Sequence, residues 1–117
     1  MKTILVVDDN RALARAIAAT LGFYEVSVTH NSEEAIARAA ALSGCDLLIA
    51  DFTMPDMEGD RLARRVREIH PAARTLLLTG YADYTILSDP DAVDAKLAKP
   101  FSPAALRQSV SALIGQP

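Results

Sequence analysis

The chain has little of several features that would assign it to other classes of protein. It contains a single cysteine, Cys45, no tryptophan, and no excess of basic residues, since the formal net charge is −3. One cysteine cannot form an intramolecular disulfide, and its place beside an apolar run is typical of a small buried residue. An acidic balance argues against direct nucleic-acid binding. The apolar run after Lys2 is too short for a signal peptide, and no stretch approaches a membrane span, so we expect a cytoplasmic protein that does not contact a membrane.

The apolar content that is present is sufficient for a folded core. Of the 117 residues, 50% are hydrophobic. This length and composition fit one domain over residues 1–117 and argue against disorder.

Apolar runs alternate with segments of helical periodicity along the chain. Strands are predicted at residues 3–7, 24–29, 46–50, 75–78 and 95–98. Helices are predicted at residues 11–21, 31–42, 61–69 and 102–115, with Asn31 and Ser102 as N-caps. Residues 84–93 are weakly patterned, and Pro90 limits any helix there to two turns or leaves an irregular loop. Continuous apolar strands separated by amphipathic helices predict an α/β fold, with a parallel sheet covered on both faces.

Polar residues stand where the predicted strands end. Asp8 and Asp9 follow the first strand, Asp51 the third, Thr79 the fourth and Lys99 the fifth. Ligands of such sheets bind outside the carboxyl ends of the strands, so we expect these side chains to converge.

The expected cluster has the composition of a phosphoryl-transfer site. Three carboxylates repel one another unless a cation lies between them, and Mg²⁺ accepts carboxylate and phosphate oxygens. Lys99 and Thr79 would add a positive charge and a hydroxyl donor for phosphoryl oxygens. An ionised aspartate is already a nucleophile, so the protein has only to align the groups and neutralise charge.

With these residues identified, the sequence closely resembles the receiver domain of two-component response regulators. The resemblance covers essentially the whole chain and rests on VVDDN, LLIADFTMPDMEG, LLLTG and AKPF. It implies a five-stranded parallel sheet in the flavodoxin-like order 2-1-3-4-5, with helices on both faces.

The resemblance also implies a role for each site residue. Asp51 would be the phosphoacceptor, and Asp8, Asp9, Asp51 and the backbone carbonyl of Thr53 would hold Mg²⁺. Thr79 and Lys99 would bind the phosphoryl oxygens, and the peptide bond between Lys99 and Pro100 would be cis.

The implied partners are proteins of a signalling pathway. A sensor histidine kinase or a histidine phosphotransfer protein would donate the phosphoryl group, and a downstream protein target or a phosphate relay would follow. The domain would be a substrate that slowly loses its own phosphate, and not a turnover enzyme.

The sequence departs from the family pattern at two places. Lys96 stands where receivers often carry the aromatic ring of their conformational switch, and Tyr81, Tyr84 or Phe101 would have to replace it. Thr53 and Tyr81 correspond to positions that tune hydrolysis of the phosphate, and a bulky Tyr81 is expected to shield it from water.

Two other functions compete with this interpretation. A divergent receiver-like module could bind proteins without taking phosphate, which Lys96 and the poor fourth helix would suit. An aspartyl-phosphate hydrolase is disfavoured, because Thr53 stands where such enzymes usually carry a second acid.

Several residues also have plainer structural interpretations. Asp9 or Asn10 could cap the helix that follows, and Leu13 could be either core or part of the partner surface. Asp56 and Glu58 are expected in the first turn of the third helix, and Gly59 in the loop before it. Surface positions are expected for His30 and His70. A solvated face is expected for the arginines of the third helix, Arg61, Arg64, Arg65 and Arg67.

Overall fold

The structure is a computed structural model, and it describes residues 1–80, 87 and 89–117. The strands are β1 (Thr3–Val7), β2 (Glu25–Thr29), β3 (Leu47–Asp51), β4 (Arg74–Thr79) and β5 (Ala95–Ala98). The α-helices are α1 (Arg11–Thr20), α2 (Ser32–Ala41), α3 (Gly59–Ile69) and α4 (Pro103–Ile114), and a 3₁₀ turn, η1, covers Pro90–Ala92.

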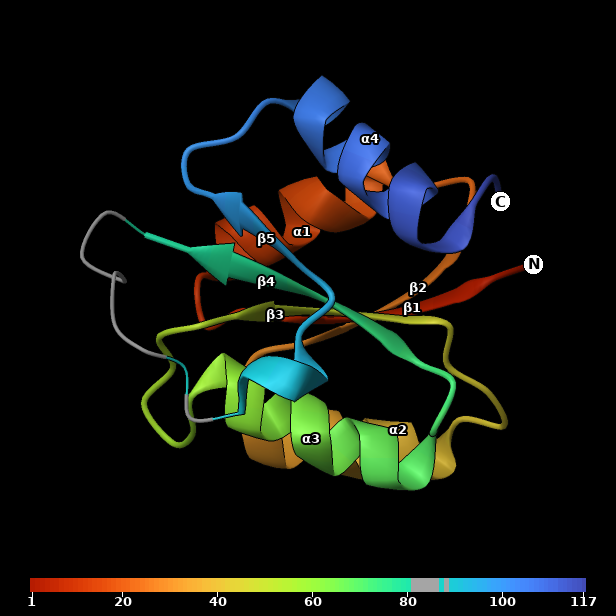
Figure 1. The fold of residues 1–117 in the computed structure, drawn as a ribbon. Helices are drawn as coiled ribbons and strands as arrows, with labels where there is room; N and C mark the ends of the chain where they lie inside the picture. The colour runs from red at the N-terminus through yellow and green to blue at the C-terminus, as the bar shows by residue number, and fades with distance from the viewer. Residues whose placement is uncertain (81–86, 88) are drawn as a thin grey trace.

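All five strands pair in parallel in the order β2-β1-β3-β4-β5. Figure 1 shows α1 and α4 on one face of this sheet and α2 and α3 on the other. The expected α/β architecture and strand order are therefore confirmed. Parallel strands require long crossover connections, and α1, α2 and α3 supply them between β1, β2, β3 and β4.

The sheet separates two hydrophobic layers, because successive side chains of a strand point to opposite faces. In β1, Leu5 and Val7 belong to the cluster beneath α2 and α3, whereas Ile4 and Val6 belong to the cluster beneath α1 and α4. All four are fully buried. Burial on both faces explains why the central strands are continuous apolar runs.

The helices α1, α2 and α4 begin at residues whose side chains cap them. The Asn31 side chain accepts a hydrogen bond from the Glu34 backbone, and Ser102 accepts one from Ala105, as predicted. Asn10, rather than Asp9, caps α1 by accepting from the backbone N–H of Leu13 at 3.1 Å. The Asp9 side chain is therefore not needed as the cap of α1.

The weakly patterned segment lies partly outside the described residues, which include 87 and 89–93 but not 84–86 or 88. In the described part, η1 begins at Pro90. Two side chains of α3 form hydrogen bonds with the backbone around this turn. The Asp89 backbone N–H donates to Asp60 at 2.9 Å, and the Arg67 guanidinium donates to the Asp91 carbonyl at 2.9 Å. The arginine face of α3 is thus only partly solvated, because Arg67 holds the chain entering β5.

Within the described ranges, no helix combines the length and the apolar character needed to cross a membrane.

Cys45 is buried as expected, with its thiol 3.5 Å from the Leu47 carbonyl oxygen. Burial raises the pKa of this thiol to about 11, from an ordinary 9.0. Because only the thiolate is nucleophilic, we expect Cys45 of the folded protein to react with a thiol reagent about 100-fold more slowly than in the urea-unfolded chain. Absorbance of released thionitrobenzoate measures both rates, and equal rates would contradict a buried thiol.

Candidate functional site

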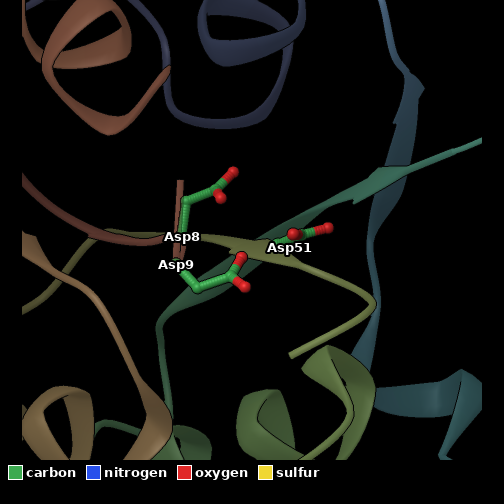
Figure 2. Close-up of side chains that lie close together, drawn as sticks. All are labelled: Asp8, Asp9 and Asp51. Atoms are coloured by element: carbon green, nitrogen blue, oxygen red, sulfur yellow. The ribbon is translucent and has the colours of Figure 1, made fainter. Parts of the chain in front are cut away.

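Three aspartates gather at the carboxyl edge of the sheet. Asp8 and Asp9 follow β1, and Asp51 is the last residue of the adjacent strand β3. Their carboxylate oxygens lie within 4.8 Å of one another, as Figure 2 illustrates. Asp8 is fully buried and Asp51 is 7% exposed, whereas Asp9 is exposed to solvent. The predicted convergence of these three acids at one edge is what the structure shows.

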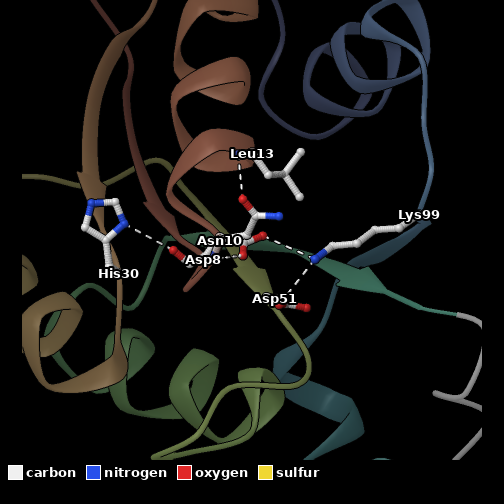
Figure 3. A network of polar contacts seen from close by, with 6 residues as sticks. All are labelled: Asp8, Asn10, Leu13, His30, Asp51 and Lys99. Carbon is white, nitrogen blue, oxygen red and sulfur yellow. Dashed lines mark hydrogen bonds and ion pairs between the residues drawn. The ribbon is translucent and has the colours of Figure 1, made fainter.

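Lys99 brings a positive charge between two of these acids from the end of β5. Its ammonium Nζ lies 3.3 Å from Asp8 Oδ2 and 3.2 Å from Asp51 Oδ2 (Figure 3). The Lys99 backbone N–H donates to the Thr79 carbonyl oxygen at 2.7 Å, which attaches the start of the loop after β5 to the end of β4. The peptide bond between Lys99 and Pro100 is cis, as the resemblance implies.

Asp8 is held in place by more than the lysine. The Asn10 backbone N–H donates to Asp8 Oδ1 at 2.9 Å, and His30 Nδ1 lies 3.2 Å from the Asp8 carbonyl oxygen (Figure 3). His30 was expected at the surface, but it is half-buried because it packs against the end of β1. His70 is also half-buried, with Nε2 2.7 Å from the Ala39 carbonyl oxygen.

The electrostatics of the cluster favour a cation. Burial raises the pKa of Asp51, while Lys99 and the backbone N–H of Thr53 stabilise its ionised form and offset part of that rise. Burial alone would lower the pKa of Lys99, but the carboxylates of Asp51 and Asp8 outweigh it and raise that pKa. Lys99 is therefore protonated, and its single positive charge neutralises only part of the negative charge of the three aspartates.

The three acids fit a hard divalent cation. Carboxylate oxygens are the ligands that Mg²⁺ prefers, and it commonly takes one or two of them while keeping several water molecules. An exposed carboxylate at Asp9 beside buried ones at Asp8 and Asp51 leaves one side of the cluster open to water. The residues present thus have the donor chemistry that such a cation needs.

The remaining predicted residues lie at the same edge. Thr53 is exposed in the loop that follows β3, and its backbone N–H donates to the Asp51 carboxylate. Thr79 ends β4, the strand beside β3, and is half-buried. Their roles toward a metal or a phosphoryl group stay predictions.

The loop between β3 and α3 closes tightly over the end of β3. The Gly59 backbone N–H donates to the Phe52 carbonyl at 2.9 Å. A Cβ placed on Gly59 would lie 2.4 Å from the Asp51 carbonyl oxygen, so only glycine fits here. Gly59 was predicted to lie in the loop, but it is the first residue of α3 and packs directly against the end of β3.

The prediction for Asp56 and Glu58 was wrong in detail. Glu58 stands at the N-cap of α3 without a side-chain capping hydrogen bond, and the acid in the first turn is Asp60. The Asp56 carboxylate accepts hydrogen bonds from the backbone of α2 instead. Sequence patterning missed this contact because it pairs a loop with a helix that is distant along the chain.

The structure describes some of the positions at which the sequence departs from the family pattern. Lys96 lies exposed on β5, so no aromatic ring occupies that position. Phe101 is half-buried and packs with the layer beneath α1 and α4, as does Leu13. Leu13 is thus partly core and partly accessible. Tyr81 and Tyr84 lie outside the described residues, so the predictions for them stay open.

Comparisons with known proteins agree with this geometry. The profile of the response regulator receiver domain matches residues 4–111. The response regulator receiver protein CpdR of Brucella abortus is 38% identical over 105 residues, which cover 86% of this chain and 87% of CpdR. The transcriptional regulatory protein TrcR of Mycobacterium tuberculosis is 34% identical over 85% of this chain, but the match spans only 40% of TrcR.

Solved structures give the same result. The response regulator protein TrrA from Thermotoga maritima, in complex with Mg²⁺ and BeF, aligns with a TM-score of 0.84 and 32% identity, over 97% of this chain and 99% of TrrA. Since the profile match covers most of the sequence, from β1 into α4, this chain belongs to the response regulator receiver domain family.

Proposed function

We propose that this receiver domain takes a phosphoryl group onto Asp51 and uses Mg²⁺ bound by Asp8, Asp9, Asp51 and the Thr53 carbonyl. The observation that supports this most is the ion pair of Lys99 with Asp8 and Asp51, beside an acidic cluster at the edge of the sheet. The complex of the relative TrrA with Mg²⁺ and BeF is consistent with the same use of this edge.

The proposed reaction requires little of the side chains beyond alignment and charge. An Asp51 carboxylate oxygen attacks the phosphorus of a phosphohistidine, an O–P bond forms, the N–P bond breaks, and the imidazole leaves with the electron pair. Lys99 and Thr79 bind the phosphoryl oxygens as charge shifts onto them. Bound Mg²⁺ would neutralise charge on the acids and the phosphoryl oxygens. The acyl phosphate is later hydrolysed slowly, so the domain is a substrate in signalling and does not turn over as an enzyme.

The proposed partners follow from this reaction. A sensor histidine kinase or a histidine phosphotransfer protein delivers the phosphoryl group at the edge formed by the acidic cluster. A downstream protein target reads the phosphorylated state, or the group is relayed onward. Because Lys96 replaces the usual ring, the second candidate is a receiver-like binding module that no longer takes phosphate.

The two candidates are separated by treating the protein with acetyl phosphate, with Mg²⁺ or with EDTA. Intact mass spectrometry measures the mass of one added phosphoryl group. The proposal expects that mass in the presence of Mg²⁺ and its loss with EDTA. An unchanged mass in both samples would support the binding module.

Lys99→Gln tests the role of the ammonium group. Beryllium fluoride mimics the phosphoryl group, and we expect its affinity in the presence of Mg²⁺ to fall about 10- to 100-fold, which is the value of one hydrogen bond to a charged group. Lys96→Gln is the matched control, because Lys96 lies exposed on the same β5. Calorimetric titration measures both variants, and equal affinities would exclude a direct role for Lys99.

A further inference from the structure

The loop that follows β3 is fastened to the start of α2 by Asp56. Asp56 Oδ2 accepts hydrogen bonds from the backbone N–H of Ser32 at 3.1 Å and of Glu33 at 3.3 Å. Asp56 Oδ1 lies 3.4 Å from the same Ser32 nitrogen. A carboxylate is favoured at this place because the first N–H groups of a helix are unpaired and carry partial positive charge.

The other end of the same loop touches the phosphoacceptor. The Thr53 backbone N–H donates to the Asp51 carboxylate, three residues before Asp56. Between them, Met54 is buried in the layer beneath α2 and α3. The loop is therefore attached at Asp51, in the core and at α2, and its short length leaves little freedom between these points.

We propose that Asp56 is a positioning residue, which sets the loop carrying Thr53 against the Asp51 carboxylate by binding the N-terminus of α2. This inference rests on the proposed use of Asp51 and Mg²⁺. It assigns to α2 a share in shaping the site, although its helical residues contribute none of the three clustered acids.

The contact does more than cap a helix, because α2 already has its own cap. Asn31 stands immediately before α2 and accepts from the Glu34 backbone at 2.8 Å. Asp56 comes from a segment 24 residues further along the chain, so its contact joins two parts of the fold. A hydrogen bond from the Ser32 side chain and those from the backbone hold the pKa of Asp56 below its ordinary value, so the carboxylate is ionised at neutral pH.

The two caps provide a matched pair of variants. Asp56→Ala and Asn31→Ala each remove one side-chain acceptor from the same helix end, but only Asp56→Ala frees the loop. For Asp56→Ala we expect the Mg²⁺ dissociation constant to rise roughly tenfold, the lower end of the loss seen when a partner that orients a metal ligand is removed. Asn31→Ala should stay within about twofold of the unsubstituted protein, and Asp56→Asn, which keeps an acceptor oxygen, should recover most of the affinity.

Calorimetric Mg²⁺ titration of the full chain measures these constants, at a temperature where circular dichroism shows each variant folded. If the unsubstituted protein fails to bind Mg²⁺, the proposed function itself is wrong. If it binds and the two alanine variants lose affinity equally, the proposed function stands and the positioning role of Asp56 is overturned.

A measurement on the unsubstituted protein decides the question should Asp56→Ala not fold. Addition of Mg²⁺ and beryllium fluoride should shift the amide resonances of Ser32 and Glu33, with the same midpoint as that of Thr53. The Glu34 amide, which Asn31 holds, should shift less. Unshifted Ser32 and Glu33 resonances would overturn the inference.

Discussion

Asp51→Asn is expected to abolish phosphorylation by acetyl phosphate and leave the fold intact. Asparagine has nearly the same shape, so it can keep the place of Asp51 at the end of β3 and against the Thr53 N–H. Its amide oxygen carries no negative charge and is not an effective nucleophile toward phosphorus. The mass of one phosphoryl group should therefore appear with the unsubstituted protein and be absent with the variant.

Asp46→Asn provides the control for this result. Asp46 immediately precedes β3 at the opposite edge of the sheet, and its Oδ2 accepts a hydrogen bond from the Thr3 backbone at 2.8 Å. Its substitution should leave phosphorylation unchanged. Persistent phosphorylation of Asp51→Asn, at the level of Asp46→Asn, would show that another residue is the phosphoacceptor.

Gly59→Ala is expected to destabilise the protein and to weaken Mg²⁺ binding together. The added Cβ would lie 2.4 Å from the Asp51 carbonyl oxygen and 2.8 Å from Leu77 Cδ1, so the start of α3 and the end of β3 must move apart. Overpacking of this kind costs about 1–3 kcal/mol of the free energy of unfolding. Because Asp51 ends β3, the same movement displaces its carboxylate from Asp8 and Lys99.

Gly44→Ala is the matched substitution, since a Cβ there would meet no atom within 4 Å. Its free energy of unfolding should change by less than about 0.5 kcal/mol, as at ordinary surface positions. Urea unfolding measures both values, and calorimetry measures Mg²⁺ affinity. Equal stability of the two variants would mean that the close contact of Gly59 with β3 is not required.

Much of the fold could be predicted because its pattern is repetitive. Three apolar runs of strand length and the capping residues Asn31 and Ser102 locate most elements within a few residues. The site also followed from the strand ends, since a parallel sheet brings Asp8, Asp51 and Lys99 to one edge. Neither inference required knowledge of how the loops are folded.

The errors lie where a contact joins segments distant in the sequence. Asp56 precedes α3, and its role was predicted from the adjacent residues of the sequence. Its hydrogen-bond partners are instead the first residues of α2. His30 contacts the Asp8 carbonyl, 22 residues away along the chain, because the loop after β2 returns to the end of β1. Periodicity and capping rules describe residues within one element, so they carry no information about such returns.

The position of the phosphoryl group tests the central proposal most directly. After treatment with acetyl phosphate and Mg²⁺, borohydride reduces an aspartyl phosphate to homoserine, and peptide mass spectrometry locates the altered residue. Homoserine at position 51, present only when Mg²⁺ is supplied, is the predicted result. Modification at another aspartate, or at none, would contradict the assignment of Asp51 as the phosphoacceptor.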